Sequence, residues 1–382
     1  MIARLNDVFA CRILCFFLSL DSALYATVIP ENIKSAVHEI TLAVILAAMI
    51  LGMLEKKYTV KYLIISVLVC LFGIFSYFQS SNTDYMITLF AAVLMYRVDI
   101  DEVLHVIYKT KFVVFVTVLG LALAGVLDRG LFFSESSTKG VLMGYVHVNM
   151  FAANVGILVL LMFAVNRHEL KKRHFIKALI SGFIVFRIGR ARSAFGLIVI
   201  TVFLIFILYH KEIRKKFLSL SRFFMPVLII INFTLVLMYC WEGTRELVGK
   251  IDSFFNGRLF LAYMNFRYYP VTLLGQKVDI SKIAADNWYY ALDNGYSYLL
   301  INYGLAGLVI FCLILQYALT SCRKSEDYVL MTTVLILMVW AVYEGMMISV
   351  GSNFTLLFCL SRVTNYPSSL RRKAVWRAQY GT

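Results

Sequence analysis

Residues 241–300 read WEGTRELVGKIDSFFNGRLFLAYMNFRYYPVTLLGQKVDISKIAADNWYYALDNGYSYLL and form the longest polar stretch of the chain. Arginines, carboxylates and aromatic side chains are dense in it. Apolar runs of about 20 residues, the length that an α-helix needs to cross a bilayer, recur on both sides of it. We therefore predict an all-α, polytopic integral membrane protein. It would form one transmembrane domain over residues 1–382, with residues 241–294 as a large loop.

The composition supports this class of protein and excludes others. Mean hydropathy is +0.79 and only 15% of the residues are charged, against about 25% in a soluble domain. The apolar runs do not alternate with period two, as the strands of an outer-membrane barrel do. The seven cysteines stand singly, without the spacing of metal ligands or of a disulfide in an outer loop. Many apolar runs follow the first one, so we do not expect a cleaved signal peptide.

Basic residues set the predicted topology. Clusters of lysine and arginine fall at the N-terminus and after every second predicted span, and such clusters favour the cytoplasmic side. About twelve spans with both termini in the cytoplasm satisfy this rule and place residues 241–294 outside. The net charge of +15 then indicates contact with anionic lipid rather than with nucleic acid. The predicted spans are 8–29, 38–54, 61–78, 84–97, 112–128, 149–165, 175–188, 193–209, 223–240, 295–319, 329–345 and 351–366.

Three arginines lie on the predicted outer side, in the turn between the seventh and eighth spans. Residues 186–193 read FRIGRARS, and Arg187, Arg190 and Arg192 have no acidic neighbour in this turn. One interpretation is that these side chains reach up to lipid headgroups. The other is an anion site, because the planar guanidinium fork matches the oxygens of a phosphate.

Helix starts on the outer side favour the anion site. Even-numbered spans begin there, and a helix N-terminus offers unpaired N–H groups and partial positive charge to an anion. Arg258 and Arg267, in the large loop, would add further guanidinium groups. The capping side chains expected at these helix starts are Asn149, Ser193, Asn294 and Ser352 or Asn353.

Asp293 and His147 are the candidate proton-transfer groups. Asp293 precedes Asn294 and an apolar helix whose start contains Tyr296. A carboxylate at a helix start is commonly a cap, and the alternative is a general base within reach of a hydroxyl. His147 stands two residues before Asn149 in the sequence GYVHVN. It is either a base, a hydrogen-bond donor to phosphate, or an interfacial side chain beside a helix cap.

Ionisable residues inside the predicted spans are costly in lipid, so Asp21 and Glu344 are functional candidates. Both lie near the outer end of a span, and we expect Glu344 to pair with an outer arginine. Asp99-Ile-Asp101 resembles a metal-binding D-x-D pattern, but it falls on the cytoplasmic side. We interpret it as a solvated helix face and expect no metal site.

Four short motifs together resemble one family of membrane enzymes. Over Gly140–Leu308, their order and predicted outward placement are similar to those of the O-antigen and capsular or exopolysaccharide repeat-unit polymerases (Wzy-type). These belong to the O-antigen ligase/polymerase superfamily. Related ligases usually have His where this chain has Asp293, which favours a polymerase. The motifs are Gly144–Asn154, Arg187–Ser193, Asn256-Gly257-Arg258 followed by Tyr268–Gly275, and Asp293–Tyr296 leading to Tyr303-Gly304-Leu305.

The resemblance implies a GT-C-like glycosyltransferase in the bacterial cytoplasmic membrane. Such an enzyme joins undecaprenyl-diphosphate-linked oligosaccharide repeat units into surface polysaccharide at the outer face. The implied partners are this lipid-linked substrate, membrane lipid, a flippase and a chain-length regulator, and no cofactor is implied. Two alternatives stay open. One is a ligase that joins finished glycan to another acceptor. The other is a flippase, which charges at mid-depth and broken helices would favour.

The resemblance also implies roles for the candidate residues. Arg190, Arg192 and Arg258 would stabilise the leaving diphosphate, which is the main electrostatic task of the reaction. Asp293 would be the base, with His147 as the rival. The other candidates for substrate binding are Arg187, Arg267, Asn149, Asn294, Tyr296 and Glu344.

Overall fold

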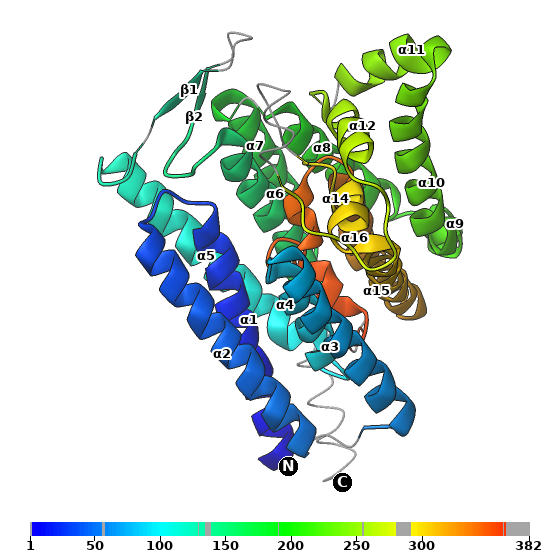
Figure 1. Ribbon diagram of the computed structural model, residues 1–382. Helices are drawn as coiled ribbons and strands as arrows, with labels where there is room; N and C mark the ends of the chain where they lie inside the picture. The colour runs from blue at the N-terminus through cyan, green and yellow to red at the C-terminus, as the bar shows by residue number, and fades with distance from the viewer. Residues whose placement is uncertain are drawn as a thin grey trace.

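The structure is a computed structural model that describes residues 2–55, 58–128, 130–133, 139–189, 191–253, 256–279, 292–361 and 363. It confirms an all-α protein (Figure 1). The α-helices are α1 (Ile2–Tyr25), α2 (Glu31–Glu55), α3 (Val60–Ser80), α4 (Asp84–Leu94), α5 (Ile100–Leu123), α6 (Val148–Val165), α7 (Lys172–Ile188), α8 (Arg192–Ile207), α9 (Lys211–Leu220), α10 (Phe224–Leu237), α11 (Glu242–Ser253), α12 (Arg258–Tyr268), α14 (Gly295–Asn302), α15 (Gly304–Lys324) and α16 (Tyr328–Trp340). Short 3-10 helices are η1 (Ser221–Phe223), η2 (Met238–Cys240), η3 (Gly345–Ile348) and η4 (Phe354–Phe358).

Six helical stretches are long and apolar enough to cross a membrane, as judged by length and composition within the described residues. Three shorter apolar helices, α4, α8 and α16, accompany them. These stretches support a multi-pass membrane protein, while the count of twelve spans stays a prediction. The six are Glu31–Leu51, Val60–Ser80, Ile100–Leu123, Val148–Val165, Lys211–Cys240 and Gly304–Lys324.

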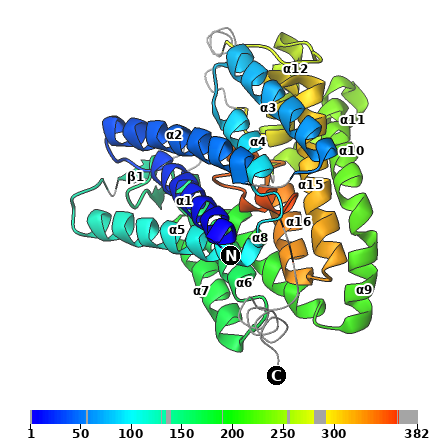
Figure 2. The ribbon, with the colours of Figure 1, turned by 90° about the horizontal axis from the view of Figure 1, so that it is seen from below.

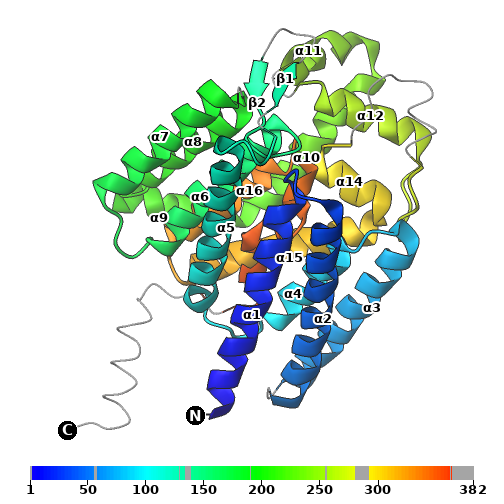
Figure 3. The same cartoon turned by 90° about the vertical axis from the view of Figure 1, so that its left-hand side faces the viewer.

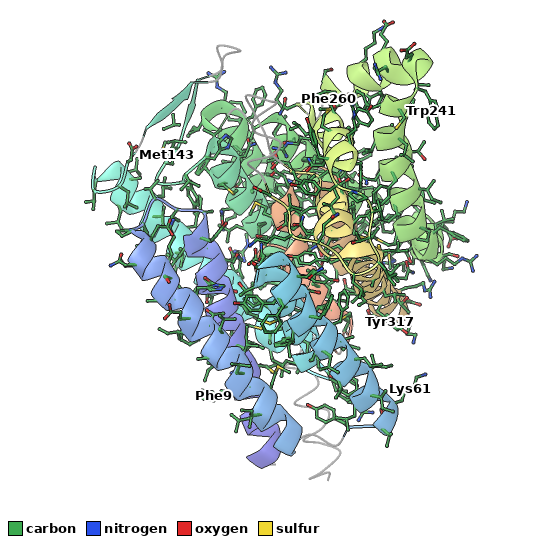
Figure 4. The ribbon with its side chains drawn as sticks, in the orientation of Figure 1. Phe9, Lys61, Met143, Trp241, Phe260 and Tyr317 are labelled. Atoms are coloured by element: carbon green, nitrogen blue, oxygen red, sulfur yellow. The ribbon has the colours of Figure 1, made fainter. Side chains whose placement is uncertain are left out.

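The molecule has two distinct ends. Helices α11 and α12 lie together with the β1–β2 hairpin at one end, and the N-terminus lies at the other (Figure 3). We call these the loop end and the N-terminal end. Trp241 and Phe260 mark the loop end, and Phe9 and Lys61 lie toward the N-terminal end (Figure 4). Seen from the N-terminal end, α1, α2 and α5 form one side of the molecule and α9 and α10 the opposite side (Figure 2).

The expected span 295–319 is two helices, because the chain breaks between α14 and α15. Gly304 has a φ of +72°, which favours glycine. A Cβ at Gly304 would lie 2.4 Å from the backbone nitrogen of Gly275, so a side chain would exclude the segment that crosses the break. That segment pairs with the backbone groups freed by the break: Leu305 N–H donates to Thr272 O (2.9 Å), Ala306 N–H to Leu273 O (3.0 Å) and Gln276 N–H to Asn302 O (3.2 Å).

The last expected span, 351–366, is wrong over its described part. Residues 351–361 form turns and the short helix η4 rather than an α-helix. The Asn353 side chain satisfies this irregular backbone, since it accepts from Thr355 N–H (3.2 Å) and donates to Met347 O (3.0 Å). Irregular backbone at membrane depth is tolerated only inside protein or beside a water-filled cavity. Residues 351–359 are all buried, in agreement with this rule.

Helix α6 runs through the core and fixes the position of the residues at its start. Fourteen of its residues are buried. It packs tightly against α16 at Gly156, where a Cβ would lie only 2.4 Å from the Trp340 ring. A short antiparallel hairpin of β1 (Leu131–Phe133) and β2 (Lys139–Val141), which the sequence did not predict, precedes α6.

Candidate active site at the loop end

Arg258, Asp293 and Glu344 come from three distant parts of the chain and meet at the loop end. Arg258 Nε lies 3.4 Å from Asp293 Oδ2, and Arg258 Nη1 lies 2.9 Å from Glu344 Oε1. The Arg258 and Glu344 side chains are 9% and 11% exposed, whereas Asp293 is 32% exposed. The predicted pairing of Glu344 with a loop arginine is confirmed. We call these three residues the loop-end cluster.

Asp252 positions Arg258 by capping α12. Its carboxylate is almost fully buried and accepts the N–H groups of Leu259 (2.9 Å) and Phe260 (2.8 Å). The Tyr239 hydroxyl donates to the same carboxylate (2.7 Å). Arg258 is the first residue of α12, so these bonds fix the origin of its side chain. A carboxylate therefore already occupies this helix N-terminus, which is not one of the span starts that we predicted to attract an anion.

Asn294 positions Asp293 at the start of α14. Its side chain accepts Ser297 N–H (2.9 Å), which confirms it as the cap of this helix. Gly295 N–H donates to Ala341 O (2.8 Å) and anchors the same turn to the end of α16. Asn294 and Tyr296 are fully buried, and their predicted contact with a substrate stays a prediction. Because Asn294 supplies the cap, the Asp293 carboxylate is left to face Arg258.

His147 caps the start of α6 and lies close enough to the loop-end cluster to interact with the charges of Arg258 and Asp293. Its Nδ1 accepts Asn149 N–H (3.1 Å), so the cap of α6 is His147 and not Asn149 as predicted. With Nδ1 accepting, the proton of the neutral ring lies on Nε2, which makes His147 a hydrogen-bond donor. Burial lowers the pKa of His147 and the Arg258 charge lowers it further, while Asp293 opposes them. Both features favour a neutral donor over a base.

The loop-end cluster holds two carboxyl groups and one guanidinium. Burial raises the pKa of Glu344, and the nearby Asp293 charge adds to this effect, while Arg258 opposes it. Glu344 is thus the carboxyl group that retains a proton more readily than usual. Asp293 is the more exposed of the two and is the one that a hydroxyl group from outside would meet first.

The turn between α7 and α8, which follows Arg187 and precedes Arg192, lies beside the first turns of α6. A Cβ at Gly189, in that turn, would lie 3.5 Å from Phe151 and 3.8 Å from Ala152. Arg187 lies in the last turn of α7 and Arg192 begins α8, and both are exposed. The turn therefore neighbours the helix start that carries His147.

Several predicted features of the arginine site are not reproduced or lie outside the described residues. Arg190 falls outside them. Ser193 was expected to cap α8, but the cap position is Ala191 and no side chain caps it. Arg267 is exposed in the last turn of α12. Within the described chain, Arg187, Arg192 and Arg267 form no ion pair with the loop-end cluster.

A second arginine cluster lies at the N-terminal end. Arg167 Nε lies 2.7 Å from Asp327 Oδ2, and its Nη2 lies 2.5 Å from Asp101 Oδ1. Asp101 is buried, so our interpretation of the D-x-D pattern as a solvated helix face is wrong. Asp99 instead caps α5 by accepting Asp101 N–H (3.2 Å). Among the described residues, no group of three or more His, Cys, Asp or Glu is arranged to hold a metal ion.

Asp21 belongs to a third polar group, between α1, α2 and α4. His38 Nδ1 lies 2.9 Å from Asp21 Oδ2, and His38 Nε2 lies 3.0 Å from Thr83 Oγ1. Nearby, the buried Lys111 Nζ donates to Ser22 Oγ (2.9 Å). Asp21 and His38 are 17 residues apart and Ser22 and Lys111 are 89 residues apart, so no local motif revealed these pairings.

The chain matches no protein-family model, no curated protein and no solved structure at a significant level.

Proposed function

We propose that this protein is a membrane glycosyltransferase that polymerises undecaprenyl-diphosphate-linked oligosaccharide repeat units. The observation that carries the proposal is the ion-paired cluster of Arg258, Asp293 and Glu344 beside His147. In this proposal the loop end faces outward from the bacterial cytoplasmic membrane, and both termini are cytoplasmic. The chain crosses the bilayer about twelve times in a GT-C-like architecture.

Asp293 is the proposed base. It would accept the proton of a hydroxyl group on the incoming repeat unit, and the hydroxyl oxygen would bond to the anomeric carbon of the growing chain. The bond from that carbon to the lipid diphosphate breaks, and its electron pair leaves with the diphosphate. The exposure of Asp293 supports this role. The hydrogen bond at His147 Nδ1 supports His147 as a donor to a phosphate oxygen.

The arginines divide between two tasks. Arg258 already faces two carboxylates, so it would hold the base in position and stabilise negative charge close to it. The exposed Arg187 and Arg192, with Arg190 between them in sequence, are the proposed donors to the leaving diphosphate. Arg267 is a secondary candidate. Donors that are already in place where negative charge develops commonly lower the barrier of such a reaction more than any other feature of the site.

Transport of a lipid-linked oligosaccharide is the second candidate function. Two observations favour it. The helix break between α14 and α15 resembles the broken helices of transporters, and the Asp21–His38 pair and Lys111 lie within or beside the helices that would cross the membrane. A transporter makes no glycosidic bond, so the two functions differ in their product.

The test compares wild-type cells with cells that carry Asp293→Asn. If the proposal holds, the variant inserts normally, and single repeat units accumulate on lipid at the outer face without long chains. Accumulation on the cytoplasmic leaflet alone would replace the polymerase with the transporter. Full-length polymer that is made but not passed to its final acceptor would indicate the ligase.

A further inference from the structure

Asn232 is a buried amide in an otherwise apolar helix. It lies in α10, whose sequence FMPVLIIINFTLVL contains one amide side chain, and the residue is 1% exposed. It stands eight residues before Cys240, the last residue of this helical run. At 1.5 Å per residue, that is about 12 Å below the loop end of the run. An amide at such a position is unfavourable unless it is hydrogen-bonded.

One side of this amide holds the residue next to the proposed base. Asn232 Oδ1 accepts a hydrogen bond from Asn294 Nδ2 (2.7 Å). Asn294 in turn caps α14 and directly follows Asp293 in the chain. The bond therefore ties α10 to the turn from which Asp293 reaches Arg258.

Two buried polar atoms beside Asn294 indicate a site for an ordered water. Asn232 Nδ2 and Ser297 Oγ are both buried and have no hydrogen-bond partner within the described chain. Both residues contact Asn294, one through its Oδ1 and the other through its backbone N–H. Buried polar groups in native proteins are nearly always satisfied, and ordered water satisfies those that lack a protein partner.

We propose that Asn232 is a positioning residue for Asp293, and that Asn232, Asn294 and Ser297 enclose a water-binding site behind it. This inference rests on the proposed function, because it concerns the base of that reaction. Without the Asn232 acceptor, Asn294 would lose the bond that orients its side chain, and the Asp293 turn would move. A displacement of about 1 Å in a catalytic group lowers the rate by about 10²-fold.

The experiment uses the purified full-length protein in nanodiscs with a lipid-diphosphate oligosaccharide as substrate. Asn232→Leu removes the acceptor at similar size, and Asn232→Asp keeps it. We expect Asn232→Leu to lower kcat by about 10²-fold with little change in KM. The acid side of its kcat–pH profile should also shift, because the environment of Asp293 changes. Asn232→Asp should recover most of kcat.

Thr201→Val is the matched control. Thr201 is buried in α8, and its hydroxyl donates only to Leu197 O in the same helix (2.7 Å). This variant should leave kcat and its pH profile unchanged. If Asn232→Leu fails to insert, Asn232→Ala, which also removes the acceptor, takes its place with the same expectations.

The outcomes separate this inference from the proposed function. If Asn232→Leu, or Asn232→Ala in its place, keeps kcat and the pH profile while Arg258→Lys is inactive, the positioning role is wrong and the function stands. If Arg258→Lys also makes polymer at the normal rate, the proposed function itself fails. In the double variant with Asp293→Asn, the Asn232 change should add no further loss, and an additive loss would contradict the inference.

Discussion

The two ends of the molecule each hold an arginine between two carboxylates, and the two clusters differ in how closed they are. At the N-terminal end, the side chains of Arg167, Asp327 and Asp101 are 2%, 5% and 9% exposed, and both contacts are 2.7 Å or shorter. In the loop-end cluster, the longer contact is 3.4 Å and one carboxylate is 32% exposed. Both ends therefore pair one guanidinium with two carboxylates, but all three side chains are buried at the N-terminal end and one carboxylate is partly exposed at the loop end.

The difference follows from what else each carboxylate does. Asp327 caps α16 by accepting Leu330 N–H (3.0 Å), so its position is fixed by the helix as well as by Arg167. At the loop end, Asn294 does the capping and leaves Asp293 facing Arg258 and the exterior. The buried cluster joins the starts of α5 and α16 to the end of α6, whereas the loop-end cluster leaves the Asp293 carboxylate partly exposed.

The largest expected effect comes from changing the matched aspartates. Asp293→Asn should lower the polymerisation rate by about 10²–10⁴-fold, because the variant lacks the proposed general base, while its Tm in detergent stays near that of the wild type. Asp327→Asn should lower Tm and yield, because it leaves Arg167 partly unpaired in a buried site. Rate assays and thermal unfolding of both proteins check this, and a reversed pattern would contradict the assignment of the two ends.

The matched arginines should show the next largest effect. Arg258→Lys keeps the charge but loses the planar fork that faces two carboxylates, so most activity should disappear at normal protein level. Arg167→Lys should instead reduce stability, since a single ammonium cannot reproduce both buried contacts. The measurement is polymer formation against Tm for the two variants. If Arg258→Lys makes polymer normally, the loop-end cluster has no role in the reaction.

Glu344→Gln should change how stability depends on pH. Burial raises the pKa of Glu344, so the folded protein holds this proton over a range where the unfolded chain has released it. The wild type should therefore lose stability as pH rises from about 4.3, the ordinary glutamate pKa, through the raised value. The Glu344→Gln variant should not lose stability in this way over the same pH range. Thermal unfolding of both proteins across this range is the check, and parallel Tm–pH curves would contradict the raised pKa of Glu344.

The smallest expected effect is at the histidines. His147→Gln retains an N–H donor and should lower activity only a few fold, whereas His147→Phe should lower it further. His168, whose Nε2 lies 3.6 Å from Asp101 Oδ2, is the counterpart at the N-terminal end. His168→Gln should leave the polymerisation rate unchanged. A rate assay on the three variants decides this, and complete loss of activity in His147→Gln would return His147 to the role of base.

Sequence patterns predicted the fold class because burial in lipid demands long apolar runs, which are visible in one dimension. They did not predict the break at Gly304, since the apolar pattern continues through it and the segment that crosses it lies some 30 residues earlier. Nor did they predict the irregular residues 351–361, where the Asn353 side chain binds Met347 O and Thr355 N–H in place of helical hydrogen bonds.

Part of the candidate site could also be predicted from patterns that are visible in the sequence. Helix starts and an unpaired charge in a span indicated Asp293, Asn294 and the pairing of Glu344 with a loop arginine. The cap at Asn149 was wrong because the helix begins one residue earlier, at Val148, and the His147 ring nitrogen accepts Asn149 N–H as its cap. The burial of Asp101 depends on Arg167, which lies far away in the sequence. A lone amide in an apolar run was the available signal for Asn232.

The most direct test of the central claim is reconstitution of the purified wild-type protein in liposomes with a lipid-diphosphate oligosaccharide on the outward-facing leaflet. The product is analysed for chain length and for the leaflet on which it lies. The account predicts a ladder of joined repeat units, which Asp293→Asn abolishes without preventing substrate binding. Repeat units that cross the bilayer unjoined, or an undiminished ladder from Asp293→Asn, would contradict it.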